Sequence, residues 1–471
     1  MNRYDVVVIG SGPAGQKAAV GAAKAGRRVA VVEQSRNIGG ACVHYGTIPS
    51  KSLRERAVER RKLTDWLDQC GMPSATPVTD VASLIGEMGE VVAAHDTYMA
   101  QQLTRNGVTV LRGRASFLDA YRLRVVHTDG SAEILGAKHF VIATGSKPRT
   151  PPNVPIDHET IFDSDSILSL AYLPASLVVL GGGVIASEYA SVFAVLGVKV
   201  TMIDRFPTPL GFLEPELVQG FLNGFARYGG SFIGEADVES VSFDGVSQVV
   251  TRLVGGREIR SEKLLCALGR RSLLDGLDAH KAGIEVDAKE LIPVNDDLQT
   301  VMRHIYAAGD VIGPPSLASA SMEQGRRVAC HLTGKDPGAQ GEWLPSGIYA
   351  VPELACVGLT EAKTKERYGG AIVGIARFDE VARGHISASQ EGLLKMIVSP
   401  DRVVRGVHVV GENATEMVHI AQMGLIQNAT VDTYVENVFN FPTFAESYRV
   451  AALAAAAKLE VSDAPTRRDV A

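Results

Sequence analysis

The sequence contains the same strand, glycine turn, helix and strand pattern twice, and this repeat constrains the fold more than any other feature. The first copy starts at the apolar run 4–9, and the second starts at 177–180. From the first glycine to the glycine that ends the helix is 16 positions in both copies (10 to 26 and 181 to 197), and to a terminal acid it is 23 (10 to 33 and 181 to 204). Such βαβ units build parallel sheets. The repeat therefore predicts an α/β fold with two Rossmann-like domains.

Each residue type in the repeat has a reason to be there if the unit binds a dinucleotide. The first glycine makes a tight turn, the second lets the backbone approach a pyrophosphate, and the third packs helix on strand. The helix N-terminus attracts the phosphates, and the acid accepts ribose hydroxyls. Glycine turns in ordinary βαβ units would not also produce matching acids. We therefore predict two dinucleotide sites, formed by Gly10, Gly12, Gly15 and Glu33, and by Gly181, Gly183 and Asp204.

Two later stretches separate the two sites by cofactor. Residues 141–145 end in Thr144-Gly145, and residues 305–310 end in Gly309-Asp310. Both resemble further fingerprints of FAD-binding domains in flavoprotein disulfide reductases, the second of which places its aspartate on the ribityl chain. The Gly309-Asp310 pair alone would also suit a simple turn. Its place in the series favours FAD in the first site, contacted by Thr144, Gly145 and Asp310, and a nicotinamide nucleotide in the second.

The choice between NAD and NADP stays open. Asp204 suits the two ribose hydroxyls of NAD and repels the extra phosphate of NADP, whereas the adjacent Arg205 is able to pair with that phosphate. A solvated loop cation is an equally good interpretation of Arg205. Ala186, at the third glycine position of the second copy, is compatible with either nucleotide.

The 471 residues suggest about three domains at roughly 150 residues each. Because Gly309-Asp310 belongs with the first copy, the second copy is an insertion, with hinges at 147–155 and after Gly269. We also count Gly269 among the residues that contact a cofactor. After residue 343, strands at 394–398 and 403–410 precede helices at 414–428 and 443–459, which predicts an α+β domain whose apolar faces suggest a dimer interface. The predicted boundaries are 1–148 and 273–342 (FAD-binding), 149–272 (NAD(P)-binding), 343–460 (dimerisation) and 461–471 (flexible tail).

Composition excludes several classes of function. The chain has 47 basic and 53 acidic residues, a net charge of -6, which gives no electrostatic case for nucleic acid or an anionic membrane. No N-terminal signal pattern and no apolar run of about 18 residues is present. The five cysteines are odd in number and scattered, which favours a reducing, cytoplasmic location, and we identify no metal-binding motif.

The loop at 39–51 and the segment at 440–446 connect these features. Together with the two glycine motifs, Lys51 and Glu188, they resemble the pyridine nucleotide-disulfide oxidoreductases over nearly the whole chain. That family carries a Cys-x4-Cys disulfide beside the flavin and a closing His-Pro-Thr-x-x-Glu motif, whose histidine comes from the partner subunit and serves as acid and base. Here Cys42 is followed five positions later by Thr47, and Phe441 stands before the proline. Threonine cannot form a disulfide, and phenylalanine cannot move a proton.

This double loss is similar to the soluble, Si-specific pyridine nucleotide transhydrogenases, a subgroup that the stretches 321–326, 382–384, 414–420 and 448–453 also resemble. Hydride exchange between nicotinamide and flavin needs neither a dithiol nor a proton shuttle. The resemblance implies transfer of hydride between NADPH and NAD through flavin N5, with Lys51 near N5 and Glu188 paired with it. A lysine at a helix start and a solvated glutamate are the plainer interpretation of these two residues.

Other interpretations remain for the loop and for the activity. Cys42 suits a thiolate adduct or charge-transfer complex if its pKa is lowered, and otherwise fills space. His44 fits a structural role better than a proton-transfer role. An NAD(P)H-dependent flavin reductase acting on quinones, dyes or oxygen is the nearest alternative activity. A redox-sensing flavoprotein with Cys42 as its sensor is an alternative of another class, and Thr47 with Phe441 disfavours a lipoamide dehydrogenase.

Overall fold

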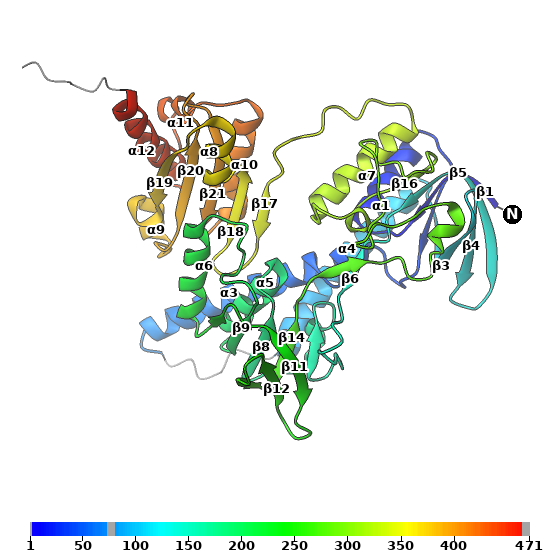
Figure 1. Cartoon of the computed structure of the whole chain (residues 1–471), viewed down its shortest axis with the longest axis horizontal. Helices are drawn as coiled ribbons and strands as arrows, with labels where there is room; N and C mark the ends of the chain where they lie inside the picture. The colour runs from blue at the N-terminus through cyan, green and yellow to red at the C-terminus, as the bar shows by residue number, and fades with distance from the viewer. Residues whose placement is uncertain (1, 73–80, 464–471) are drawn as a thin grey trace, which may run out of the picture. The chain divides into compact units, whose positions relative to one another are not determined.

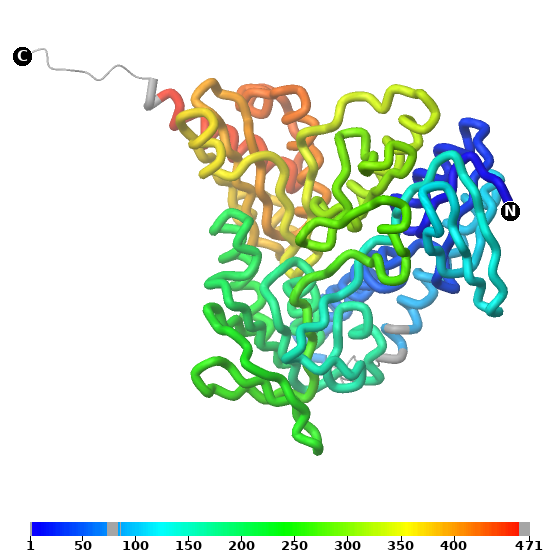
Figure 2. The backbone as a smooth tube through the Cα atoms, turned by 45° about the vertical axis from the view of Figure 1, so that its right-hand side comes forward, coloured from blue at the N-terminus to red at the C-terminus, as the bar shows by residue number. Residues whose placement is uncertain are grey.

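The computed structural model describes residues 2–72 and 81–463. The chain forms two compact units, each built from two separate stretches of sequence. Unit 1 is Met1–Leu173 with Leu265–Gln340, and unit 2 is Pro174–Leu264 with Gly341–Ala471. The colour gradient of Figure 2 follows the chain through these stretches.

Unit 1 is organised around a parallel sheet whose central strand is β1 (Asn2–Ile9). Strand β1 pairs in parallel with β2 (Val29–Glu33) and β5 (Ala132–Ile142), so that Val7 faces Ala30 on one side and Phe140 on the other. Beyond these strands, β3 (Thr109–Asp119) pairs with β2, and β16 (Ile305–Ala307) pairs with β5. An antiparallel strand, β4 (Arg122–His127), joins the far ends of β3 and β5. This is the Rossmann-like sheet that the first repeat predicts.

Helices α1 (Pro13–Lys24) and α7 (Ala318–Leu332) pack against each other in unit 1, as Figure 1 shows. Small residues allow the close approach. A Cβ added to Gly21 would lie 2.5 Å from Ala329 Cβ, and one added to Gly325 would lie 2.1 Å from the carbonyl oxygen of Ala14. Three further helices follow β2 in sequence: α2 (Gly40–His44), α3 (Thr47–Gln69) and α4 (Val81–Arg105). Long helices therefore make up most of the described chain between β2 and β3.

The two predicted hinges pair with each other. Strand β6 (Ser146–Pro148) runs antiparallel to β15 (Arg270–Ser272), with Ser146 opposite Ser272. Arg149 N donates to the Gly269 carbonyl at 3.0 Å, which extends the ribbon by one residue. The inserted segment therefore leaves and re-enters through adjacent strands, close to β7 (Ile161–Asp163) and β14 (Lys263–Cys266) in sequence.

The first stretch of unit 2 repeats the βαβ arrangement. Parallel strands β8 (Ser176–Leu180), β9 (Lys199–Ile203) and β10 (Ser231–Ile233) carry helices α5 (Val184–Val195) and α6 (Pro215–Arg227). A three-stranded antiparallel sheet follows, made of β11 (Val238–Phe243), β12 (Val249–Leu253) and β13 (Glu258–Ser261). The second repeat is thus also a Rossmann-like unit.

The second stretch of unit 2 is the predicted α+β domain. Its antiparallel sheet has the order β17-β18-β21-β20-β19, and Figure 1 labels its helices α8 to α12. The strands are β17 (Ser346–Ile348), β18 (Leu354–Gly358), β19 (Ile372–Arg377), β20 (Leu393–Val398) and β21 (Val404–Val410). The helices are α8 (Glu361–Tyr368), α9 (Ala382–Ile386), α10 (Ala414–Ile426), α11 (Val431–Glu436) and α12 (Glu446–Asp463).

The predicted fold class is confirmed, whereas the exact domain boundaries stay a prediction. Helix α12 extends to Asp463, three residues into the segment predicted as a tail, and residues 464–471 lie outside the described residues. Within 2–72 and 81–463, no helix has both the length and the apolar composition needed to cross a membrane.

Candidate functional site

The first glycine turn has two glycines that the protein's own packing requires and one that faces open space. Gly10 has φ +103°, and a Cβ there would lie 2.3 Å from the Ala143 carbonyl oxygen. A Cβ on Gly15 would lie 2.0 Å from the Gly10 carbonyl oxygen. At Gly12, in contrast, no atom of the described residues other than its own chain neighbours lies within 4 Å of the position of a Cβ. The turn therefore leaves a cradle at Gly12 and the start of α1, which fits a pyrophosphate.

Glu33 ends β2 beside this turn and is buried. Its Oε2 accepts hydrogen bonds from Ser11 N at 2.9 Å and from Ser11 Oγ at 2.7 Å, and Oε1 accepts one from Ser35 N at 2.8 Å. The Ser11 hydroxyl in turn accepts from Gly39 N at 3.0 Å. Glu33 thus holds the turn and the start of the cysteine loop together. The sequence did not indicate this contact, because Ser11 is a variable position of the motif; the ribose role of Glu33 stays a prediction.

The cysteine loop lies directly against the glycine turn. Gly40 has φ +61°, and a Cβ there would lie 3.0 Å from Gly12 Cα. Cys42 lies on α2, and the Thr47 side chain at the start of α3 forms a hydrogen bond with its thiol. Lys51, one turn further along α3, donates from Nζ to Ser50 Oγ at 3.3 Å.

Burial raises the pKa of the Cys42 thiol. The hydrogen bond with Thr47 and the positive charge of Lys51 lower this pKa by less, and the negative charge of Asp310 raises it. The thiol is therefore protonated at neutral pH, and the lowered pKa that a thiolate role requires is not found. The same electrostatic contributions place Lys51 and Asp310 in the neighbourhood of Cys42. Residues far apart in the sequence are thus brought together within unit 1.

Asp310 and Thr144 complete this side of the site. Asp310 Oδ2 accepts a hydrogen bond from Ser146 Oγ at 2.6 Å, and Ser146 Oγ accepts one from Arg270 Nε at 2.9 Å. Gly145 has φ +73° and follows Thr144, whose Oγ1 is shielded from solvent without a hydrogen-bond partner among the described residues. Shielded polar atoms normally have partners. The hydroxyl therefore fits a bound group, and the Gly12 cradle and Asp310 fit the same group.

His44 has a structural role in the loop. Its Nε2 lies 2.7 Å from the Ile38 carbonyl oxygen, and the Ile38 N–H donates to Asp96 Oδ1 at 2.7 Å. The ring closes the turn between β2 and α2. This agrees with the structural role that we expected.

In unit 2 the second glycine turn also combines glycines that the protein's own backbone requires with one that faces open space. Gly181 has φ +113°, and apart from the adjoining backbone no described atom lies within 4 Å of the position of a Cβ on Gly183. A Cβ on Gly182 would lie 2.6 Å from Asp204 Oδ2, so the carboxylate at the end of β9 lies directly over the turn. Ala186 is fully buried at the third position, where it packs α5 on the sheet. This cradle fits a second dinucleotide.

Arg205 lies beside that carboxylate. Its guanidinium stacks on the ring of Phe206 at 5.0 Å from the centroid, and Phe206 is 57% exposed. Asp204 Oδ1 accepts a hydrogen bond from Phe206 N at 3.2 Å. A carboxylate and an exposed guanidinium therefore lie next to each other after β9, so the choice between NAD and NADP stays open. Gly269, with φ +99°, lies at the hinge in unit 1.

Glu188 is buried on α5 and contacts the second stretch of unit 2. Its Oε1 accepts a hydrogen bond from Tyr349 N at 2.9 Å, and Ser191 Oγ accepts one from Val351 N at 3.0 Å. The sequence could not show this contact, because the donors are backbone groups. Lys51 belongs to unit 1 and Glu188 to unit 2, so their pairing stays a prediction.

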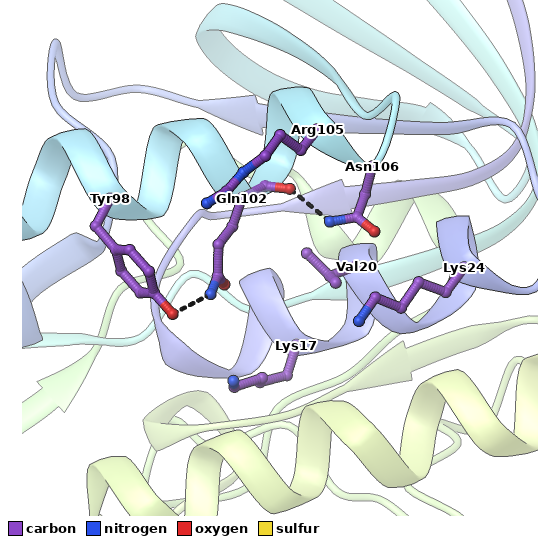
Figure 3. A pocket seen from close by; sticks show the side chains of 7 residues that line it. All are labelled: Lys17, Val20, Lys24, Tyr98, Gln102, Arg105 and Asn106. Carbon is purple, nitrogen blue, oxygen red and sulfur yellow. Dashed lines mark hydrogen bonds between the residues drawn. The ribbon is translucent and has the colours of Figure 1, made fainter.

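A surface pocket of about 470 Å³ lies between α1 and α4, as Figure 3 shows. Asn106 Nδ2 donates to the Gln102 carbonyl at 2.7 Å on its rim. Two of its cations, Lys24 and Arg105, lie in the last turns of their helices, where positive charge is favourable. The lining contains none of the predicted site residues; it consists of Lys17, Val20, Lys24, Tyr98, Gln102, Arg105 and Asn106.

Family comparisons agree with this arrangement. Residues 4–325 match the model of the pyridine nucleotide-disulphide oxidoreductases, and residues 344–452 match the dimerisation domain of the same family. The chain belongs to this family. The first match covers both glycine turns and Asp310, and the second covers the α+β domain.

Relatives with curated names include soluble pyridine nucleotide transhydrogenases. The one from Mycobacterium bovis is 41% identical over 96% of this chain and 97% of its own length. The one from Photobacterium profundum is 38% identical, with the same coverage. The resemblance to this subgroup is thereby confirmed.

Solved structures of the family superpose over the same extent. The flavoprotein disulfide reductase RclA from Escherichia coli has a TM-score of 0.87 at 27% identity, covering 96% of this chain and 99% of its own. LpdA from Mycobacterium tuberculosis has a TM-score of 0.88 at 26% identity with the same coverage. The fold is therefore shared with both solved structures, one of which is named as a flavoprotein disulfide reductase.

Proposed function

We propose that this protein is an FAD-dependent NAD(P) transhydrogenase that moves hydride between NADPH and NAD without a redox disulfide. One observation carries the proposal: two dinucleotide cradles are kept, while the position of the second redox cysteine holds Thr47, hydrogen-bonded to a protonated Cys42. A flavin, when bound, supplies the two-electron chemistry of accepting hydride at N5 and returning it. The names of the relatives support this activity.

The chain's own residues bind and orient in this proposal. Gly12 and the N-terminus of α1 hold the FAD pyrophosphate, Thr144 and Asp310 hold its other polar groups, and Lys51 provides a positive charge near Cys42. Cys42 packs as a neutral thiol. Phe441 supplies no proton, and hydride exchange between nucleotides requires none from it.

One nicotinamide site then serves both substrates in turn. Gly183 provides the cradle, Asp204 accepts the ribose hydroxyls of NAD, and Arg205 pairs with the additional phosphate of NADP. A negatively charged and a positively charged side chain at the same ribose position suit a protein that must release one nucleotide before it binds the other.

We further propose a cytoplasmic homodimer. The α+β domain matches the family's dimerisation domain, and it exposes large apolar side chains, among them Phe441 at 69% and Val438 at 88%. Large exposed apolar side chains of this kind indicate a surface that a partner subunit covers in the dimer. All five cysteines are free thiols, which supports a reducing compartment.

The test is a coenzyme assay with purified holoprotein. NADPH should reduce a spectrally distinct NAD analogue with ping-pong kinetics at full FAD occupancy. No transfer between nucleotides, together with fast reduction of a quinone or of oxygen, would instead identify a flavin reductase. Appreciable oxidation of dihydrolipoamide would contradict the argument from Thr47 and Phe441.

A further inference from the structure

A lysine is buried between the two stretches of unit 2. Lys395 lies on β20 with only 1% of its side chain exposed. Its Nζ donates to Glu214 Oε2 at 2.7 Å, Glu216 Oε1 at 2.9 Å and Glu361 Oε2 at 2.8 Å. We call these four residues the Lys395 cluster. Three carboxylates satisfy all three donors of the ammonium, which is the arrangement that a buried charge requires.

The ammonium stays charged in this cluster. Burial alone lowers the pKa of Lys395, but the hydrogen bonds with Glu214, Glu361 and Glu216 raise it above its ordinary value. The neighbouring strand contributes no competing cation, because burial lowers the pKa of His408, which lies opposite Lys395 in the register. The Lys395 ammonium is therefore charged near neutral pH and forms an ionic attachment between the two stretches.

The carboxylates of the Lys395 cluster come from both sides of the contact. Glu214 and Glu216 lie at the N-terminus of α6, in the nucleotide-binding stretch, whereas Glu361 lies at the start of α8 in the α+β domain. Along α6, a Cβ on Gly220 would lie 3.0 Å from Val410, and one on Gly224 would lie 2.3 Å from Pro352. Helix α6 thus lies flat on the α+β domain, with its N-terminus fixed by Lys395.

The loop that carries the proposed nucleotide-selecting residues ends where α6 begins. This loop, residues 204–214, begins at Asp204 over the second glycine turn. Leu210 N donates to the Gly182 carbonyl at 2.7 Å, so the loop returns to that turn before it reaches Glu214 four residues later. The loop is therefore held at β9, at Gly182 and at the Lys395 cluster.

We infer that Lys395 is a positioning residue for nicotinamide nucleotide binding. It fixes the end of the 204–214 loop through Glu214 and Glu216, and so sets where Asp204 and Arg205 stand over the glycine turn. Lys395 does not touch the nucleotide site itself. The inference rests on the proposed function, since it assumes that unit 2 binds the nicotinamide nucleotide.

A matched pair of variants separates positioning from general stability. Glu216→Gln and Glu361→Gln each remove one partly exposed carboxylate from the same ammonium, at 37% and 47% side-chain exposure. Only Glu216 belongs to the loop side of the contact. We expect Glu216→Gln to raise KM for both nucleotides by about fivefold with kcat little changed, because a charge-assisted bond to the first turn of α6, where the loop ends, is weakened. Glu361→Gln should leave KM within about twofold, while both variants lower the melting temperature equally.

Lys395→Met provides the stronger perturbation. If the holoprotein folds, KM for both nucleotides should rise by at least about tenfold while the flavin content stays that of the wild type. If it does not fold, the two glutamine variants decide alone. Equal changes in KM for Glu216→Gln and Glu361→Gln, or no change in either, would overturn the inference.

The readout also distinguishes failure of the inference from failure of the proposed function. Anaerobic reduction of the bound flavin by NADPH, monitored in a stopped-flow spectrometer, gives an apparent Kd for NADPH that does not depend on the acceptor. A wild type that is reduced but does not pass hydride to NAD contradicts the transhydrogenase proposal, and the Kd values of the variants still test Lys395. Normal transfer between nucleotides with unchanged Kd values contradicts only the role of Lys395.

Discussion

Replacing Gly12 or Gly183 by alanine should remove one cofactor each without unfolding the protein. Gly12 has φ -64° and Gly183 has φ -79°, both of which alanine adopts freely. Within 2–72 and 81–463, only the adjoining backbone lies within 4 Å of either new methyl group. Loss of unfolded-state entropy stabilises such variants by roughly 0.4–1 kcal/mol, and the poorer N-cap residue costs a similar amount. The free energy of unfolding of the apoprotein should therefore change by less than about 1 kcal/mol.

The effect on binding should be much larger. The methyl group occupies the space through which the phosphate approaches the backbone, and a hydrogen bond to a charged group contributes about 1.5–3 kcal/mol. Affinity should fall by about 10-fold to about 150-fold. For Gly12→Ala this appears as loss of flavin absorbance after gel filtration, restored by excess FAD. For Gly183→Ala the flavin content stays normal, and KM rises for NADPH and NAD.

Gly89→Ala is the control, because it also adds a methyl group to open space but lies on α4 and belongs to neither glycine turn. It should keep the flavin and both KM values. The reasoning is refuted if Gly12→Ala retains FAD with wild-type affinity, or if Gly183→Ala loses flavin instead of nucleotide.

Three further outcomes follow from the site and the core. Cys42→Ser should keep turnover within about twofold, and the pH–rate profile of the wild type should show no thiolate limb between about pH 6 and pH 8, because burial raises the pKa of this thiol. Thr47→Cys should form a disulfide with Cys42 that adds about 2 kcal/mol to the free energy of unfolding, measured by denaturation with and without reductant. This variant should still have no disulfide reductase activity, because Phe441 supplies no proton. Tyr448→Phe should cost about 1–3 kcal/mol in the same denaturation assay, since its buried hydroxyl donates to the Met417 carbonyl at 2.7 Å. An unchanged midpoint for Tyr448→Phe would contradict this last reasoning.

The fold was predictable because its signals are local. Apolar runs and glycines within about 25 residues indicate each βαβ unit. Strand β9 lies between Gly197 and Asp204, where the repeat places the second strand of the unit. The alternation of strands and helices after residue 343 was sufficient for the α+β domain. What local patterns do not contain is which strands and helices meet across long separations.

The site was predictable only in part, for the same reason. The glycines, the acids and Thr144 fall on motif positions, so their grouping into two cradles could be expected. The Lys395 cluster could not, because Lys395 and Glu214 are 181 positions apart and each looks like an ordinary surface charge. The backbone donor of Tyr349 to Glu188 leaves no trace in the sequence at all. For Cys42, burial decided a question of pKa that residue spacing had left open.

The insertion between β6 and β15 also fixes an order of events during synthesis. Strand β5 pairs with β16 through Phe140 and Ile305, and Asp310 follows β16. At roughly 5–20 residues per second, a ribosome that has completed β5 needs about 8 to 33 seconds to reach β16. The inserted nucleotide-binding segment emerges in that interval, while the edge of β5 is still unpaired. Of the two nucleotide-binding domains, the one whose glycine turn appears first in the sequence is therefore completed second. The contact that we propose between Asp310 and FAD can form only after the second glycine turn has already been made.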